Sequence, residues 1–343
     1  MIQLSNLNIE ETIWLTPPVD LKKELPMSVS SIETIHQGRE TIRKVLSGKD
    51  KRKIIIVGPC SIHNVDEAML YAEKLHKLSE KVKKKFLILM RVYFEKPRST
   101  IGWKGLINDP HLDSSFDIER GLRLARNLLI DISEMGLNTA TEFLDFVTPQ
   151  YIDELITWAA IGARTTESQV HRQMASGFSM PVGFKNTTNG NIDIAINAIE
   201  SSRSPHHFIG IDGSGDVSIF KTRGNKHTHL ILRGGDKKNY DKKSVELVQK
   251  KLTNSKINSK IIVDCSHGNS EKDHKKQVEV FMDVINQIKK GNKDIVGLML
   301  ESNLSEGNQK VSKKLKKGVS VTDACIGWKE TEKLILDAYK KIK

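Results

Sequence analysis

The sequence is poor in several features that would define its class. Among 343 residues only three are cysteine (Cys60, Cys265 and Cys325), and their scattered spacing fits neither a disulfide framework nor a finger-type zinc site. No apolar run reaches the roughly 18 residues that a membrane span requires. The start of the chain, MIQLSNLNIEET, has neither the basic nor the apolar region of a secretory signal. We therefore expect a cytoplasmic protein with no membrane partner.

Acidic residues are fewer than basic ones. The chain has 54 Lys and Arg against 42 Asp and Glu, which gives a formal net charge of +12. The lysines are spread through the chain, with runs at 83–85 and 313–317, and no aromatic residues interleave with them to form a nucleic-acid-binding stripe. We expect no nucleic-acid partner. The charge fits solvated helix faces, or an anionic small molecule if arginines gather at one site.

What the sequence does contain is a regular alternation of apolar strands and amphipathic helices. The first strand, KIIIVG, is followed by a helix from about Asp66 to Lys83, with Asp66 as its expected N-cap. Further apolar runs lie near residues 86–92, 139–145, 158–164, 180–186, 228–235, 260–269 and 295–302. Eight such units predict an α/β fold, the (β/α)8 TIM barrel.

Two segments fall outside this alternation. Residues 1–50 precede the first strand, and we expect them to form an N-terminal extension that makes regulatory or oligomer contacts and is not part of the core. Residues 51–343 are then the catalytic barrel. Within it, two strand-like runs flank Asp212-Gly213 and predict an inserted β-hairpin at about 206–222.

Polar side chains stand where the predicted strands end. The carboxyl ends of barrel strands meet at one face, so these side chains should converge. Breaking a buried ion pair costs roughly 3 to 5 kcal/mol, so such a ring requires ligands or mutual pairs. The ring consists of Cys60, Arg91, Glu142, Arg164, Lys185, Arg233, His267 and Glu301.

The ring divides into two chemical groups. Cys60, His267 and Glu301, joined by Asp323, offer sulfur, nitrogen and oxygen ligands for one divalent metal ion such as Mn, Fe, Co or Zn. The second group consists of cations that suit carboxylate and phosphate oxygens. Its members are Arg91, Arg98, Arg164, Lys185 and Arg233. They exceed the needs of one monoanion and predict two phosphorylated substrates, or one that carries both phosphate and carboxylate.

Several longer motifs together indicate a family. GPCSIH, MRVYFEKPR, GWKGLINDP, GARTTESQ, PVGFKN, LRGG, SHGN and TDACIGW resemble those of class I 3-deoxy-D-arabino-heptulosonate 7-phosphate (DAHP) synthases of the microbial, feedback-regulated type. The resemblance covers nearly the whole chain. It implies a metal-dependent transferase that condenses phosphoenolpyruvate with D-erythrose 4-phosphate and water, the first step of the shikimate pathway to aromatic amino acids. It also implies a homodimer or homotetramer.

The resemblance implies roles for individual residues as well. The metal ligands would be Cys60, His267, Glu301 and Asp323. Phosphoenolpyruvate would be held at its phosphate by Arg164, Arg233 and the backbone of Ala163, and at its carboxylate by Arg91 and Lys185. Arg98 and Ser99 would receive the erythrose phosphate. Lys96 would lie beside the reacting aldehyde as a proton donor, and Glu142 would order water or substrate near the phosphate.

An inhibitor pocket is a further implication of the resemblance. It would bind an aromatic amino acid between the extension and the hairpin, at positions matched by Phe143, Gln150, Ser179 and Phe208. Gly210 stands where the family usually has serine, so the effector is not specified. Cys265 replaces the usual aromatic residue before SHGN, and we expect it to bring a second thiol near the metal.

Three alternatives remain open. Lys185 at a strand end would also suit a metal-independent Schiff-base aldolase. Enzymes that make 3-deoxy-octulosonate 8-phosphate or sialic acid share the use of phosphoenolpyruvate, although the KPRS loop and the hairpin favour the four-carbon sugar phosphate. A non-enzymatic basic scaffold would bind nucleic acid with a steep salt dependence. It does not explain the polar residues at the strand ends.

Overall fold

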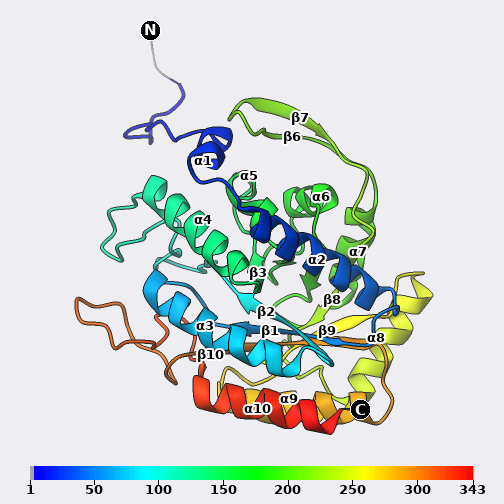
Figure 1. The fold of residues 1–343 in the computed structure, drawn as a ribbon. Helices are drawn as coiled ribbons and strands as arrows, with labels where there is room; N and C mark the ends of the chain where they lie inside the picture. Colours follow the sequence, from blue (N-terminus) through cyan, green and yellow to red (C-terminus); the bar gives the residue numbers. More distant parts are fainter. Residues whose placement is uncertain (1–3, 343) are drawn as a thin grey trace.

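The apolar runs form a closed barrel of eight parallel strands within residues 4–342, which the computed structural model describes (Figure 1). The strands follow the order β1-β2-β3-β4-β5-β8-β9-β10, and β10 pairs with β1 to close the barrel. Their bounds are Lys53–Gly58, Phe86–Arg91, Asn138–Glu142, Trp158–Ile161, Val182–Lys185, Thr228–Leu232, Ile261–Asp264 and Ile295–Asn303. A short strand, β11 (Ile326–Gly327), pairs in parallel with the last residues of β10, Ser302 and Asn303. The predicted α/β barrel is confirmed.

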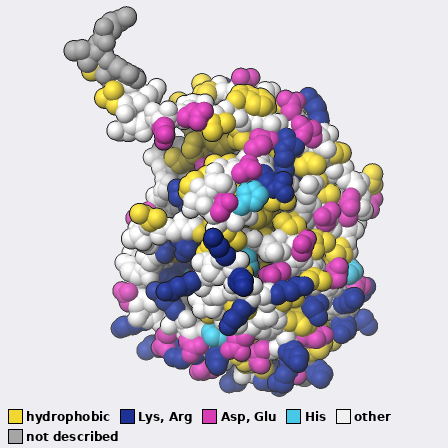
Figure 2. Space-filling model, turned by 90° about the vertical axis from the view of Figure 1, so that its left-hand side faces the viewer, with side chains coloured by type: hydrophobic (Ala, Val, Ile, Leu, Met, Phe, Trp, Pro, Cys, Tyr) yellow, Lys and Arg dark blue, Asp and Glu magenta, His cyan; other side chains and the backbone are white. Residues whose placement is uncertain are grey.

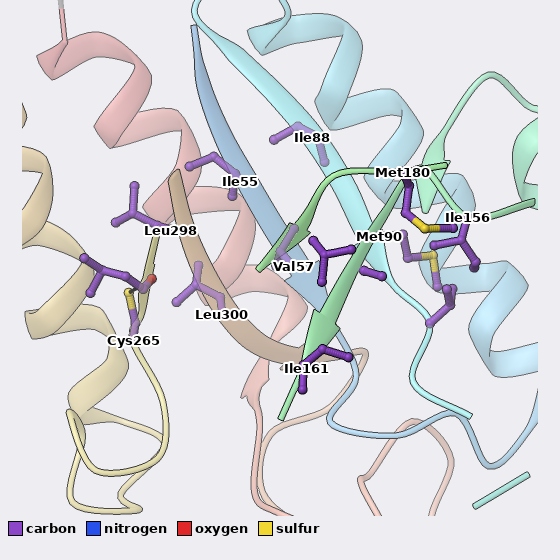
Figure 3. Packing of buried hydrophobic residues seen from close by; sticks show 14 of the residues in the cluster. Ile55, Val57, Ile88, Met90, Ile156, Ile161, Met180, Cys265, Leu298 and Leu300 are labelled. Carbon is purple, nitrogen blue, oxygen red and sulfur yellow. Dashed lines mark hydrogen bonds between the residues drawn. The ribbon is translucent and has the colours of Figure 1, made fainter. Parts of the chain in front are cut away.

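Each strand is buried on both faces, which explains why the strands read as continuous apolar runs. Because successive side chains point to opposite faces, Ile54 and Ile56 of β1 belong to the cluster inside the barrel. Ile55 and Val57 belong instead to the layer between the strands and the surrounding helices (Figure 3). The barrel therefore has a filled interior and a second hydrophobic layer outside it.

Amphipathic helices cover the outside of the barrel. Their bounds are Val65–Val82 (α3), Ile118–Glu134 (α4), Gln169–Gly177 (α6), Asp193–Arg203 (α7), Lys242–Asn254 (α8), Lys276–Lys289 (α9) and Trp328–Lys341 (α10). Between β3 and β4 lie the short α5 (Thr148–Ile152) and the 3-10 turn η1 (Asp153–Leu155). Among the residues described, no helix has the length and apolar character that crossing a membrane requires.

The predicted N-cap of α3 is wrong. Asn64 is the N-cap, because its backbone is extended and its side-chain Oδ1 accepts a hydrogen bond of 2.9 Å from the Glu67 N–H. Asp66 lies inside the first turn instead, where its negative charge interacts favourably with the helix dipole.

The N-terminal extension contains two helices with different surroundings. These are α1 (Pro18–Glu24) and α2 (Val29–Leu46). The α2 residues Ile42, Val45 and Leu46 belong to the same buried cluster as the inward-facing strand residues. The expectation that residues 1–50 stay outside the core is therefore wrong for α2. Without α2 the amino-terminal end of the barrel would expose its apolar interior to water.

The predicted hairpin is confirmed. It consists of β6 (His207–Ile211) and β7 (Val217–Lys221), which pair antiparallel with Ile209 opposite Ile219. Its turn touches α1, where the Val19 N–H donates a 2.7 Å hydrogen bond to the carbonyl of Gly213. The hairpin therefore lies beside the extension and outside the barrel wall, as Figure 1 shows.

One buried arginine fastens the extension to the barrel. Arg126 of α4 is 1% exposed. Its Nε donates to the carbonyl of Leu25, just after α1, at 2.8 Å. Its Nη1 donates to the carbonyl of Tyr151 at 2.8 Å and to Glu154 Oε1 at 2.7 Å. A single guanidinium thus joins α1 to α5 and η1.

We expect Arg126→Met to lower the free energy of unfolding by about 3 kcal/mol, because buried acceptors lose a charged donor. Arg123→Met on the same helix is the matched control. Its side chain is 33% exposed and pairs with surface carboxylates, so its loss should cost less than about 1 kcal/mol. Urea denaturation followed by circular dichroism measures both. Equal losses in the two variants would contradict the fastening role of Arg126.

Candidate active site

A cavity of about 410 Å³ lies at the carboxyl ends of the strands. The loops after β2 and β10 project to this side of the barrel, and Figure 2 shows that Lys and Arg side chains gather on the face. The cavity brings together most of the sequence-predicted site residues. They are Arg91, Lys96, Arg98, Glu142, Ala163, Arg164, Lys185, Arg233, His267, Glu301 and Asp323. Ser99 follows Arg98 in an exposed loop and does not line the cavity.

Three predicted metal ligands form a tight cluster. The ligand atoms of Cys60, Glu301 and Asp323 lie within 4.8 Å of one another. His267 borders this cluster, with its Nε2 3.9 Å from Glu301 Oε1. Sulfur, imidazole nitrogen and carboxylate oxygen together fit a divalent transition metal. The cluster is therefore a candidate metal centre, with His267 as the side chain that completes it.

Neighbouring groups hold the cluster in place. Gln277 accepts a hydrogen bond from the Glu301 N–H at 2.8 Å and donates to the Glu301 carbonyl at 3.1 Å. The Glu301 carboxylate pairs with Arg91 Nη2 at 3.1 Å. Lys96 Nζ donates to the carbonyl of Cys60 at 3.1 Å and lies 3.2 Å from its Sγ. Glu301 and Cys60 are thus each held by partners from other elements of the fold.

Burial, reinforced by Glu301, raises the pKa of the Cys60 thiol to about 11. A thiol needs to lose its proton before it can ligate a metal, so cation binding at this site would release a proton. For Asp323 burial would raise the pKa, but the charges of Lys96 and His267 hold it below its ordinary value. Asp323 is therefore a carboxylate at neutral pH.

The cationic group contains an unsatisfied donor. Arg91 is 1% exposed, and its Nη1 has no hydrogen-bond partner among the residues described. Its guanidinium also stacks over the ring of Tyr93 at 3.9 Å. An unpaired buried donor costs about 1 to 3 kcal/mol, so this nitrogen predicts an acceptor supplied by a ligand. Arg233 is buried close by, whereas Arg164 is exposed at the cavity mouth.

Sequence reasoning missed Asp264, which joins the two chemical groups. Its Oδ2 lies 3.1 Å from Lys185 Nζ and 3.0 Å from His267 Nδ1. Burial would raise the pKa of Asp264, but Lys185 and His267 hold it well below the ordinary value. The available signal was a single carboxylate inside the apolar run IIVDC. Tyr93 was missed too, because an aromatic residue within MRVYF looks like ordinary core.

The charge of Lys185 is fixed by its neighbours. Burial alone would lower the pKa of Lys185, but Asp264, Tyr93 and Glu142 raise it above the ordinary value. Glu142 Oε2 lies 3.8 Å from the ammonium group. Lys185 is consequently a permanent cation in this cavity.

The positions matched to an inhibitor pocket lie outside this cavity. The buried ring of Phe143 packs on Phe178 at 5.0 Å, next to Ser179. Gln150 lies on α5. Phe208 lies on the hairpin, where its ring stacks on Phe220 at 5.6 Å. The structure thus links Phe143 to the Ser179 segment and places Phe208 against the second hairpin strand.

The expectation that Cys265 brings a second thiol near the metal is wrong. Its side chain lies in the hydrophobic layer outside the barrel with Leu298 and Leu300 (Figure 3). Because neighbouring side chains of an extended segment alternate, the inward position of Asp264 turns Cys265 outward. The second thiol close to Cys60 is instead that of Cys325, which is also buried.

Comparison with known proteins gives consistent matches over nearly the whole chain. Residues 21–336 match the model of the DAHP synthetase I family. The Tyr-sensitive phospho-2-dehydro-3-deoxyheptonate aldolase of Salmonella typhimurium is 48% identical over 342 residues, with 99% of this chain and 96% of that protein covered. The Phe-sensitive enzyme of Escherichia coli strain K12 is 49% identical over 343 residues, with coverages of 99% and 98%.

A solved structure matches as well. It is the phospho-2-dehydro-3-deoxyheptonate aldolase of Francisella tularensis SCHU S4, with a TM-score of 0.96 and 51% sequence identity. The alignment covers 98% of both chains. The eight-stranded barrel and the inserted hairpin are therefore features that this chain shares with that enzyme.

We expect Asp264→Asn to weaken Mn²⁺ binding by about 10- to 100-fold, because a neutral amide orients His267 poorly and removes the nearer of the two carboxylates paired with Lys185. Isothermal titration calorimetry measures the Mn²⁺ affinity, with protein from which a chelator has first removed any metal. Asp66→Asn, at an exposed position on α3, is the matched control and should leave the affinity unchanged. Wild-type Mn²⁺ affinity in Asp264→Asn would rule out this orienting role.

Proposed function

Because this chain belongs to the DAHP synthetase I family, we propose a role for each part of its cavity in the reaction of a phospho-2-dehydro-3-deoxyheptonate aldolase. The enzyme is a transferase that performs the first step of the shikimate pathway to aromatic amino acids. We propose that its substrates are phosphoenolpyruvate, D-erythrose 4-phosphate and water. The observation that carries this proposal is the meeting of the metal-ligand cluster and the buried cations in one cavity.

Phosphoenolpyruvate would be bound by the cationic group. Arg91 and Lys185 would take its carboxylate, and the unpartnered Arg91 Nη1 supports this assignment. Arg164 and Arg233, with the backbone of Ala163, would take its phosphate. Charge-assisted hydrogen bonds contribute roughly 1.5 to 3 kcal/mol each, so these groups suffice to orient a trianionic substrate.

The metal would be held by Cys60, His267, Glu301 and Asp323, whose mixed donor set suits Mn, Fe, Co or Zn. A bound divalent ion of this kind polarises a carbonyl oxygen or lowers the pKa of a water molecule. Gln277 and Asp264 keep two of the ligands oriented, Gln277 at Glu301 and Asp264 at His267.

Lys96 would act as the proton donor. In the proposed reaction C3 of the enol attacks the aldehyde carbon, water adds at C2, and phosphate leaves with cleavage of its carbon–oxygen bond. Burial would lower the pKa of Lys96, but Cys60 and Glu301 raise it above the ordinary value, so the ammonium is available to protonate the developing alkoxide. Glu142 would order water or substrate near the phosphate, and Arg98 and Ser99 would receive the erythrose phosphate.

The Schiff-base alternative is disfavoured by the environment of Lys185. A lysine that attacks a carbonyl requires a lowered pKa and a free amine. Lys185 instead keeps its proton, because Asp264 lies 3.1 Å from its Nζ. Among the substrates of related phosphoenolpyruvate-dependent enzymes, the KPRS loop favours erythrose 4-phosphate.

We further propose a homodimer or homotetramer in which residues 1–50 make oligomer and regulatory contacts. The outer face of the hairpin exposes Ile209, Val217 and Ile219 by 72% or more, and Leu7 and Trp14 of the extension are similarly exposed. Apolar faces of this kind are typical of interaction sites, and a second copy of the chain is the partner that every molecule has available. The three free cysteines are consistent with the proposed cytoplasmic location.

We also propose feedback inhibition by an aromatic amino acid, since relatives are named Tyr-sensitive and Phe-sensitive. Phe143, Gln150, Ser179 and Phe208 would form the pocket. A Cβ on Gly210 would lie 2.9 Å from Phe220, so glycine here permits the ring of Phe220 to stack on Phe208. The hairpin side of the pocket is therefore more apolar than a serine would make it.

The test of function is phosphate release. We expect release to require both phosphoenolpyruvate and erythrose 4-phosphate, to stop after chelation and to return with Mn²⁺. One of phenylalanine, tyrosine or tryptophan should inhibit it. A protein that releases no phosphate with both substrates and metal present would contradict the proposed substrates. Release that persists after complete chelation would contradict the proposed metal requirement.

We expect Lys96→Met to lower kcat by about 10²- to 10⁴-fold, as for loss of a general acid, while the Kd for phosphoenolpyruvate stays within about threefold. Steady-state kinetics and calorimetric titration separate the two effects. Lys104→Met, which removes an exposed lysine from the same loop, is the control and should keep both values. Parallel losses of kcat and of phosphoenolpyruvate affinity would remove Lys96 from the proton-donor role.

A further inference from the structure

A second cavity, of about 230 Å³, lies at the opposite end of the barrel from the active site. It is formed by the end of α2, the end of α7 and the segments that lead into β8 and β9. It shares no lining residue with the active-site cavity. Its polar lining includes Arg43, Ser47, Arg203, Lys226, His227 and Lys260.

The lining is cationic and contains no carboxylate. Two cations have carboxylate partners that do not line the cavity, Arg43 with Glu40 and Lys260 with Asp294. The other two, Arg203 and Lys226, form no ion pair among the residues described. Arg203 Nη2 donates to the carbonyl of Thr228 at 3.0 Å, and Glu200 is the carboxylate whose charge acts on it.

Two further observations indicate an absent acceptor. The Nε of Arg43 is buried and has no hydrogen-bond partner within residues 4–342. Burial and the charges of Arg43, Arg203 and Lys226 lower the pKa of His227, while only Glu40 acts in the opposite direction. Unpaired donors and mutually repelling cations cost free energy unless an anion satisfies them.

Structural contacts account for only part of this arrangement. Residues at the amino-terminal end of a barrel usually serve stability, and like charges around a cavity oppose it. Arginine forks and ammonium groups are the preferred ligands of phosphate oxygens. A phosphate dianion also matches the two cations that lack carboxylate partners.

We propose that this cavity binds a phosphate group, supplied either by free inorganic phosphate or by a phosphomonoester. Its volume lies below the roughly 300 to 1,000 Å³ of pockets that enclose whole drug-sized ligands, so it would hold the phosphate and leave any attached group at the opening. The occupant would contact Arg43, whose Nη2 also donates to the carbonyl of Ser179 at 2.7 Å. Binding would thus restrain the segment that leads into β5.

The imidazole of His227 is a reporter specific to this cavity. In protein labelled with ¹³C-histidine, we expect inorganic phosphate at constant ionic strength to raise the pKa of His227, because an anion favours the imidazolium. Lys226→Gln should raise the half-saturating phosphate concentration at least about threefold, since an exposed charge pair is lost. Lys250→Gln, at an exposed position on α8 outside the cavity, should leave the concentration unchanged.

Two further experiments identify the source of the phosphate group and exclude a response that arises from binding at the active site. Glucose 6-phosphate replaces inorganic phosphate in a second titration, and a response to either ligand, or to both, supports a phosphate-group site and identifies its source. Arg164→Gln alters only the active-site cavity and should leave the His227 response intact. No response of His227 to either ligand, or an equal response to added chloride, would overturn the proposal.

Discussion

The contact of Asp264 with Lys185 and His267 is the interaction on which the active-site end of the barrel depends. A buried ammonium group is tolerated only when an anion lies against it. Asp264 is closer to the ammonium group of Lys185 than Glu142 is. The same carboxylate orients the histidine of the metal-ligand cluster. The substrate side and the metal side of the cavity are therefore coupled through one side chain, and a change at either side alters the electrostatics of the other.

The two ends of the barrel meet different physical demands. At the carboxyl end the strands finish in charged residues that stabilise one another and leave donors such as Arg91 Nη1 for ligands. At the amino end α2 supplies Ile42, Val45 and Leu46 to the interior and excludes water. The strands between them are apolar on both faces, so they set the positions of the charged side chains rigidly.

Much of this arrangement could be predicted from the sequence. The apolar runs located all eight strands, and the polar residues after them located the cavity. The sequence could not show that Asp264 bridges Lys185 and His267, because that contact depends on which way one strand residue points. The sequence also could not place α2, because an amphipathic helix has the same hydrophobic pattern whether it covers the side or the end of a barrel. Cys265 was misplaced for a related reason, the unknown register at the end of β9.

The division of the extension between α1 and α2 determines how much of it could be removed without opening the barrel. The segment before Pro26 touches the hairpin and the surface of α4, whereas α2 is part of the barrel interior. A deletion that ends near Pro26 would strip away the contacts to the hairpin and leave the barrel sealed. A deletion through Leu46 would open the core. The tolerance of this chain to shortening should therefore change sharply near Pro26, because residues on the two sides of that proline serve different parts of the fold.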